Sequence, residues 1–125
     1  MTLDRAVFQS WLDRYIAAWR SNDPTAIWDL VAEDAVYHHR PTDEPLRGRG
    51  AIVADWRPED PATWDARYEV LAIDGEVHVA SGWSNYLEDG VQVAGYSNIF
   101  VCRFDAGGRC TEFTEWWTQD RRFEG

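Results

Sequence analysis

Hydrophobic and polar positions alternate along residues 64–119, which is the pattern of half-buried β-strands. Three turn segments, 73–76, 88–91 and 104–109, divide this stretch into four expected strands. The first two turns contain Asp-Gly, a pair that favours a tight hairpin turn because that turn needs positive φ at its central residues. The pattern therefore predicts a four-stranded antiparallel meander.

The turns also predict which side chains share a face of this sheet, because side chains alternate along each strand. If residues 73 and 76, 88 and 91, and 104 and 109 close the turns, one face carries an apolar, a polar and an aromatic layer. These layers are Val70, Val79, Phe100 and Phe113; Tyr68, Ser81, Asn98 and Glu115; and Ala66, Trp83, Tyr96 and Trp117. Apolar burial with a few convergent polar groups is what a small-molecule pocket requires, so we predict a pocket on this face. The alternative is a packed core whose polar side chains satisfy one another.

The N-terminal half favours helices. The expected helices span about 2–21, 23–34 and 51–57, and a short strand spans 35–40. Thr2 and Asp23 are candidate N-caps, and Pro24 suits a first helical turn. On the short strand, alternation places Tyr37 and His39 on one side. Helices followed by a meander predict an α+β domain, with three N-terminal helices packed on one face of a strongly curved antiparallel sheet.

Composition narrows the possible functions. A chain of 125 residues with 45% hydrophobic residues suits a single domain, 1–125, with a real core. The formal net charge of −10 disfavours nucleic acid and anionic membrane surfaces as partners. No apolar run reaches membrane-spanning length, so we expect a cytoplasmic protein.

Cysteine and histidine positions give no sign of a disulfide, metal or cofactor site. The expected register places Cys102 and Cys110 on opposite faces, which disfavours a disulfide. His38 and His39 are adjacent on a strand and point apart, and His78 is expected on the outer face. We therefore expect neither a metal nor a cofactor.

Three runs of sequence carry a family resemblance. They are Tyr-Ile-Ala-Ala-Trp-Arg-Ser-Asn-Asp (15–23), Ile-Trp-Asp-Leu-Val-Ala-Glu-Asp-Ala-Val (27–36) and Glu-Pro-Leu-Arg-Gly-Arg-Gly-Ala-Ile (44–52). With a closing strand that contains Glu-Trp-Trp (115–117), the chain resembles the nuclear transport factor 2-like superfamily and, within it, the SnoaL-like polyketide cyclase and ketosteroid isomerase branch. The resemblance implies a cone-shaped fold, which hosts cyclases, isomerases, dehydratases, epoxide hydrolases and non-catalytic domains.

The resemblance also implies site residues. Tyr15 lies where ketosteroid isomerases have the tyrosine that stabilises an enolate oxyanion, which is a match. His39 lies where that family has its aspartate base, and Phe100 lies where it has a protonated aspartate, so two positions differ. SnoaL-like cyclases use an acidic residue for proton transfer, and Glu115 is the carboxylate that the expected register places on the pocket face. Epoxide hydrolases of this fold would show an arginine between two aspartates, and the expected sheet face carries no arginine.

Two functions from different classes follow. In the first, the protein is a cofactor-free cyclase, isomerase or dehydratase for a hydrophobic, oxygenated ring compound, with His39 or Glu115 as general acid or base and Tyr15 as oxyanion donor. The residues expected to bind the ligand are Tyr37, Trp56, Tyr68, Ser81, Trp83, Tyr96, Asn98, Phe100, Phe113 and Trp117. The alternative is a non-catalytic module for ligand binding or dimerisation. In that case His39 is a satisfied strand-end histidine, Tyr15 belongs to the core, and Glu115 hydrogen-bonds to Asn98.

The outer face of the expected sheet suits a homodimer under either function. It offers an apolar patch of Val91, Val93, Ile99, Val101 and Trp116 beside Ala80. Exposed apolar patches of this kind mark interaction surfaces, so we expect a second copy of the chain as a partner.

Overall fold

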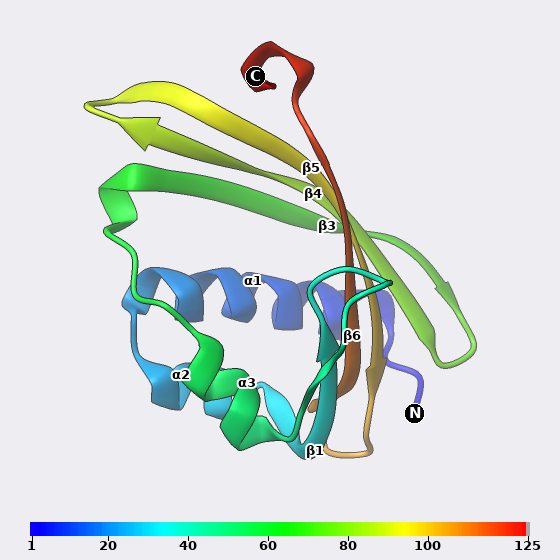
Figure 1. Cartoon of the computed structure of the whole chain (residues 1–125). Coiled ribbons are helices and arrows are strands. Elements are labelled where there is room, and N and C mark those ends of the chain that lie inside the picture. The colour runs from blue at the N-terminus through cyan, green and yellow to red at the C-terminus, as the bar shows by residue number, and fades with distance from the viewer. Residues whose placement is uncertain (125) are drawn as a thin grey trace.

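The computed structural model describes residues 1–124 and has the predicted α+β architecture. In chain order the elements are α1 (Arg5–Ser21), α2 (Pro24–Trp28), β1 (Val31–His38), β2 (Leu46–Arg47), α3 (Arg49–Asp55), η1 (Pro61–Thr63), β3 (Trp64–Asp74), β4 (Val77–Glu88), β5 (Val91–Phe104), β6 (Cys110–Gln119) and η2 (Arg121–Phe123). The sheet has the strand order β2-β1-β6-β5-β4-β3. β1 runs parallel to β6, and the other neighbouring strands are antiparallel. The long strands curve over α1, and the three helices lie on the concave side (Figure 1).

The first helix begins later than predicted. Asp4 is its N-cap, with a side-chain oxygen that accepts a hydrogen bond from the Val7 amide at 2.9 Å, so the expected cap at Thr2 was wrong. Thr2 instead donates its hydroxyl to the Gly75 carbonyl oxygen at 2.7 Å. Both residues favour N-caps, and the docking of the N-terminal segment on the sheet decides between them.

The second helix ends earlier than predicted. Asp23 is its N-cap, as expected, but α2 stops at Trp28 and β1 already begins at Val31. Val31 pairs with Cys110, and the Cys110 amide donates to the Leu30 carbonyl oxygen at 2.9 Å. Pairing with β6, which is distant in sequence, therefore overrides the local helical spacing.

The edge strand β3 is protected by α1. The Gln9 side chain donates to the Tyr68 carbonyl oxygen at 2.9 Å and accepts from the Val70 amide at 3.0 Å. Arg5 donates to the Val70 carbonyl oxygen at 3.0 Å. These side chains form hydrogen bonds with backbone groups of β3 that would otherwise be free to pair with another chain.

The expected register was wrong in all three hairpins, although the second turn closes as predicted. The first turn is closed by Asp74 and Val77, which displaces the pairing by two residues, and an irregularity between Val70 and Ala72 reduces this to one. Beyond that point β4 is displaced by one residue against β3, so its inward-facing set changes. An irregularity near Leu87 then displaces β5 by one residue as well, although Glu88 pairs with Val91 as predicted. The two displacements cancel, so Tyr68 and Asn98 still share a row, with Gly82 between them in place of Ser81.

The third hairpin displaces β6 by two residues. Phe104 pairs with Cys110, and Glu115 therefore lies opposite Phe100 instead of Asn98. A displacement of two keeps each side chain on its predicted face but moves it along the sheet. The inner face is thus built from three successive rows: Val70, Ala80, Phe100 and Glu115; Tyr68, Gly82, Asn98 and Trp117; Ala66, Ser84, Tyr96 and Gln119.

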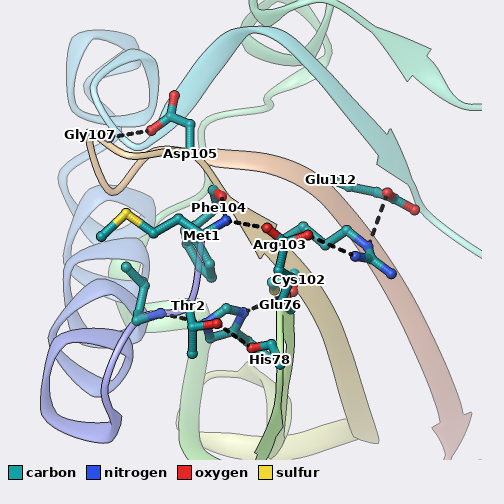
Figure 2. A network of polar contacts seen from close by, with 12 residues as sticks. Met1, Thr2, Glu76, His78, Cys102, Arg103, Phe104, Asp105, Gly107 and Glu112 are labelled. Atoms are coloured by element: carbon teal, nitrogen blue, oxygen red, sulfur yellow. Dashed lines mark hydrogen bonds and ion pairs between the residues drawn. The ribbon is translucent and has the colours of Figure 1, made fainter.

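Three residues that the expected register placed elsewhere are buried in the core. His78 was expected on the outer face, and Cys102 and Cys110 were expected on opposite faces. His78 is fully buried, and its Nε2 accepts from the Leu3 amide at 2.9 Å (Figure 2). Its Nδ1 lies 2.9 Å from the Glu76 carbonyl oxygen, so the ring anchors the N-terminal segment to β4. Cys102 and Cys110 are both buried and free, and both belong to the core cluster, which corrects the prediction of opposite faces.

The core beneath the pocket is mainly aromatic. Trp11 and Tyr15 of α1 stack at 5.6 Å between ring centroids, and Tyr15 stacks in turn on Phe113 of β6 at 5.7 Å. Phe8 packs edge-on against Phe104 at 5.5 Å. Rings with two χ angles hold such geometry firmly, so this stack fixes the position of Tyr15 against the sheet.

Candidate functional site

A pocket of about 330 Å³ opens between the concave face of the sheet and the helices. It is lined by Tyr15, Trp19, Tyr37, His39, Leu46, Ile52, Asp55, Trp56, Arg57, Glu59, Tyr68, Ser84, Tyr86, Phe100 and Glu115. This volume falls at the small end of the range for small-molecule sites, and the lining combines aromatic walls with a few polar groups. A second, apolar void of about 20 Å³ lies beyond the shared wall of Tyr15, Tyr37, Ile52 and Trp56.

Phe100 forms the centre of the pocket wall on the sheet. It is buried, and the Tyr68 ring stacks on it with centroids 4.1 Å apart. Glu115 lies beside Phe100 on the next strand. A ligand that covers Phe100 therefore has Tyr68 on one side and Glu115 on the other.

Glu115 is the acidic group that the sheet contributes to the pocket lining. The Tyr37 hydroxyl donates to its Oε2 at 2.7 Å. Burial raises the pKa of Glu115, and the Tyr37 hydrogen bond and the charge of His39 counteract that rise only in part. The carboxyl group can therefore exchange a proton closer to neutral pH than an exposed glutamate does.

Tyr15 faces the pocket from α1. Burial, followed by the negative charge of Glu115, raises the pKa of Tyr15 well above its usual value. Burial also raises the pKa of Tyr37, with the neighbouring Tyr15 and Glu115 as further causes. Both hydroxyls consequently stay protonated, so each can donate a hydrogen bond to an oxygen atom.

The rim of the pocket carries a histidine and carboxylate pair. His39 Nε2 lies 2.8 Å from Asp55 Oδ2, and the two side chains are 50% and 43% exposed. Burial raises the pKa of Glu59, which also lines the pocket. Arg57 reaches the pocket from the segment after α3, so the pocket does contain an arginine although the sheet face contributes none to the lining.

Asn98 is buried behind the pocket wall. Its Nδ2 donates to the Tyr68 hydroxyl at 2.6 Å and to Ser84 Oγ at 3.2 Å. The alternative role considered for Glu115, a hydrogen bond to Asn98, is not found, because β6 is displaced and Tyr37 donates to Glu115 instead.

The structure brings together seven of the predicted site residues in the pocket lining: Tyr15, Tyr37, His39, Trp56, Tyr68, Phe100 and Glu115. Phe113 lies behind the wall and stacks on Tyr37 at 4.9 Å. Tyr96 and Trp117 share the inner face but form their own edge-on pair, with centroids 5.6 Å apart, away from the lining. Ser81 and Trp83 belong to the outer face, because β4 is displaced by one residue.

Sequence reasoning missed several lining residues: Trp19, Leu46, Ile52, Asp55, Arg57, Glu59, Ser84 and Tyr86. A signal for Ser84 and Tyr86 was present, because Gly82 interrupts an otherwise regular strand pattern, and a glycine in a strand often marks a close approach. The residues from α3 and the segment after it carry no such signal.

None of the helices in residues 1–124 is both long and apolar enough to cross a membrane. Within the same residues, no group of three or more His, Cys, Asp and Glu side chains is arranged to hold a metal ion.

Comparison with known proteins agrees with this architecture. A solved structure described as an NTF-2 like protein of unknown function, from Burkholderia xenovorans LB400, superposes with a TM-score of 0.68 at 18% identity, covering 96% of this chain and 88% of that chain. At this identity the likeness shows the fold alone. No functionally curated protein shows significant similarity to the chain. The family described as the SnoaL-like domain matches residues 12–113, which include the second half of α1, the helices α2 and α3, and most of the strands around the pocket. The chain therefore belongs to the SnoaL-like domain family, within the nuclear transport factor 2-like fold.

Proposed function

We propose that this protein binds a hydrophobic, oxygenated ring compound and moves a proton within it without a cofactor, as a cyclase, isomerase or dehydratase does. The observation that carries the proposal is the Glu115 carboxyl group, which lies in an aromatic pocket, accepts a hydrogen bond from Tyr37, and has a raised pKa. Charged side chains are rarely enclosed in this way without a partner or a task.

Glu115 suits the role of general base better than His39. Glu115 lies against Phe100 on the inner face of the sheet, where a ring compound would lie, and Tyr37 orients it. His39 lies at the half-exposed rim and is engaged by Asp55. Catalytic proton transfer needs close reach to the substrate, which the position of Glu115 on the inner face gives more directly than the rim position of His39.

The reaction would begin with removal of a proton next to a carbonyl group. The Glu115 carboxylate takes the proton, and the electrons of the broken C–H bond form the C=C bond of an enolate. The carbonyl oxygen becomes negative and accepts a hydrogen bond from the neutral Tyr15 hydroxyl. Return of the proton from Glu115 to another carbon completes an isomerisation. Attack of the enolate carbon on a second carbonyl carbon, with protonation of its oxygen, completes a cyclisation.

Deuterium exchange tests this proposal even when the product has not been identified. Steroids, polyketides and aromatic ketones are first screened by tryptophan fluorescence, because Trp19 and Trp56 line the pocket. Compounds that bind are then incubated with the protein in D₂O, and deuterium next to the carbonyl is measured by NMR. We expect exchange that falls by about 10²- to 10⁴-fold in Glu115→Gln, the usual contribution of general acid–base catalysis.

The matched control is Glu112→Gln, because Glu112 lies on the same strand but is exposed. It should leave exchange unchanged. Equal exchange in Glu115→Gln and the parent would exclude Glu115 as the base. Binding without any exchange would favour the alternative function, a ligand-binding module without turnover.

We also propose that two copies of the chain pair through the outer face of the sheet. Trp116 and Trp83, which belong to this face, are 54% and 37% exposed, and Val93 nearby is 42% exposed. Exposed tryptophans on a sheet face support such an interface. Ala80 does not take part, since it is fully buried on the inner face, contrary to expectation.

A further inference from the structure

Asn98 makes an unusual contact with two hydroxyl groups. Its Nδ2 atom carries two hydrogens, and one is directed at each of the Tyr68 and Ser84 oxygens. The exposed fractions of Asn98, Tyr68 and Ser84 are 5%, 4% and 6%, so solvent does not compete strongly for these bonds. Both hydroxyls therefore act as acceptors toward Asn98.

Each hydroxyl retains one hydrogen that it can donate. Among residues 1–124, neither the Tyr68 nor the Ser84 hydroxyl donates a hydrogen bond to a residue outside this group of three, and both side chains line the pocket. Two donors that are held by a common neighbour and border the same pocket make a preorganised site for an acceptor oxygen. Burial, followed by the negative charge of Glu115, raises the pKa of Tyr68 above its usual value. Hydrogen bonds with Asn98 and Ser84 counteract that rise only in part, so the hydroxyl keeps its hydrogen.

Gly82 makes this arrangement possible. It lies between Tyr68 on β3 and Asn98 on β5, in register with both. A Cβ atom at this position would overlap the Tyr68 ring and the Arg67 carbonyl oxygen. The absence of a side chain allows the Tyr68 ring to lie across β4, so that its hydroxyl reaches Asn98.

We propose that Tyr68 and Ser84, held by Asn98, bind a second oxygen atom of the ligand, on the opposite side of Phe100 from Glu115. The inference rests on the proposed function in placing the ligand over Phe100, and it narrows the substrate class. The substrate is a ring compound with two separated oxygen groups: one reacts near Glu115 and Tyr15, and the other is a carbonyl or hydroxyl oxygen that accepts from Tyr68 and Ser84. Asn98 is a positioning residue, since it acts through the two hydroxyls.

Two probes of similar shape test this inference by calorimetry: 6-acetyl-2-naphthol and 6-isopropyl-2-naphthol. Only the acetyl compound has a carbonyl oxygen that can accept a hydrogen bond at this position of the ring. We expect the acetyl compound to bind about 3- to 10-fold more tightly, which is the usual net effect of one hydrogen bond. Tyr68→Phe and Ser84→Ala should each reduce this preference, while Ser81→Ala, on the same strand as Ser84 but on the outer face, should keep it.

Asn98→Asp gives a sharper test of the positioning role. A carboxylate of the same shape accepts from both hydroxyls and turns their hydrogens away from the ligand, so the preference should disappear. Circular dichroism shows whether each variant is folded. If Asn98→Asp does not fold, Tyr68→Phe and Ser84→Ala test the oxygen site in its place. A preference that survives in folded Asn98→Asp would overturn the role assigned to the Asn98 amide.

The remaining outcomes separate this inference from the proposed function. Equal affinity of the two probes in the parent protein would overturn the second oxygen site and leave proton transfer by Glu115 intact. Failure of both probes to bind would overturn the second oxygen site, while deuterium exchange by another ketone would still support proton transfer by Glu115. A clear acetyl preference with no deuterium exchange by any ketone would retain the oxygen site and overturn catalysis.

Discussion

At the scale of single residues, the ionisation of Glu115 should affect stability as well as chemistry. Burial is the main cause of its raised pKa, so the folded protein binds this proton more tightly than the unfolded chain does. The stabilising contribution is then complete below the unfolded pKa, about 4.3, and is lost as the pH rises through the folded pKa. We expect Glu115→Gln to be more stable than the parent at pH 7 and equally stable near pH 4.

Urea unfolding at a series of pH values checks this expectation. Gln is neutral and can still accept from Tyr37, so the substitution removes the charge and keeps the shape. Glu112→Gln again serves as the control and should show no such pH-dependent gain, because Glu112 is exposed. Lower stability of Glu115→Gln at pH 7 would mean that the ionised carboxylate stabilises the fold.

Single residues also show how far the site could be predicted. The positions of Tyr68, Asn98 and Phe100 on the inner face followed from alternation along their strands, and the structure agrees. Ser81 and Trp83 were misplaced because β3 contains an irregularity between Val70 and Ala72, which shifts the pairing with β4 by one residue. An extra residue in one strand gives no clear signal in the alternating pattern, but it inverts the faces of the partner strand beyond it.

At the scale of elements, the contact between α1 and β3 protects the edge of the sheet. Gln9→Ala would remove two hydrogen bonds to the β3 backbone and leave the Val70 amide without its partner. We expect a loss of about 1–2 kcal/mol in the free energy of unfolding, measured in urea. The neighbouring, exposed Ser10→Ala is the control. A loss equal to that of the control would show that water replaces Gln9 at this edge.

The elements differ in how well local sequence predicts them. The Asp-Gly turn at residues 89–90 formed where predicted, because both residues adopt positive φ as a tight hairpin requires. The end of α2 was misjudged because residues 31–34 have helical spacing and yet belong to β1, which pairs with β6. Such pairing depends on contacts distant in sequence, which a local pattern does not contain.

At the scale of the whole molecule, the proposed pairing of two copies has a direct test. Trp116→Glu places a charge on the outer face of the sheet and should convert a dimer to a monomer in sedimentation velocity measurements. Val7→Glu is the control, because Val7 is 48% exposed on α1. A parent protein that sediments as a monomer at micromolar concentration would contradict the pairing.

The overall architecture was predictable because two independent signals agreed. The order of helices followed by strands indicated the α+β class, and the resemblance over residues 15–52 indicated the cone-shaped fold. Neither signal predicts that Asp55 and Arg57 line the pocket. Asp55 ends α3 and Arg57 follows it, and the spacing of hydrophobic residues does not predict where the chain runs after a short helix.

The hydrogen bond between Tyr37 and Glu115 joins residues 78 positions apart in the chain. It spans β1 and β6, which are parallel neighbours and so need the intervening helix and strands as their connection. During synthesis, the Tyr37 hydroxyl therefore cannot bond to Glu115 until β6 has emerged and docked, and contacts of such long range form slowly. Recovery of the pocket after refolding should follow the docking of the last long strand, well after α1 regains its helical form.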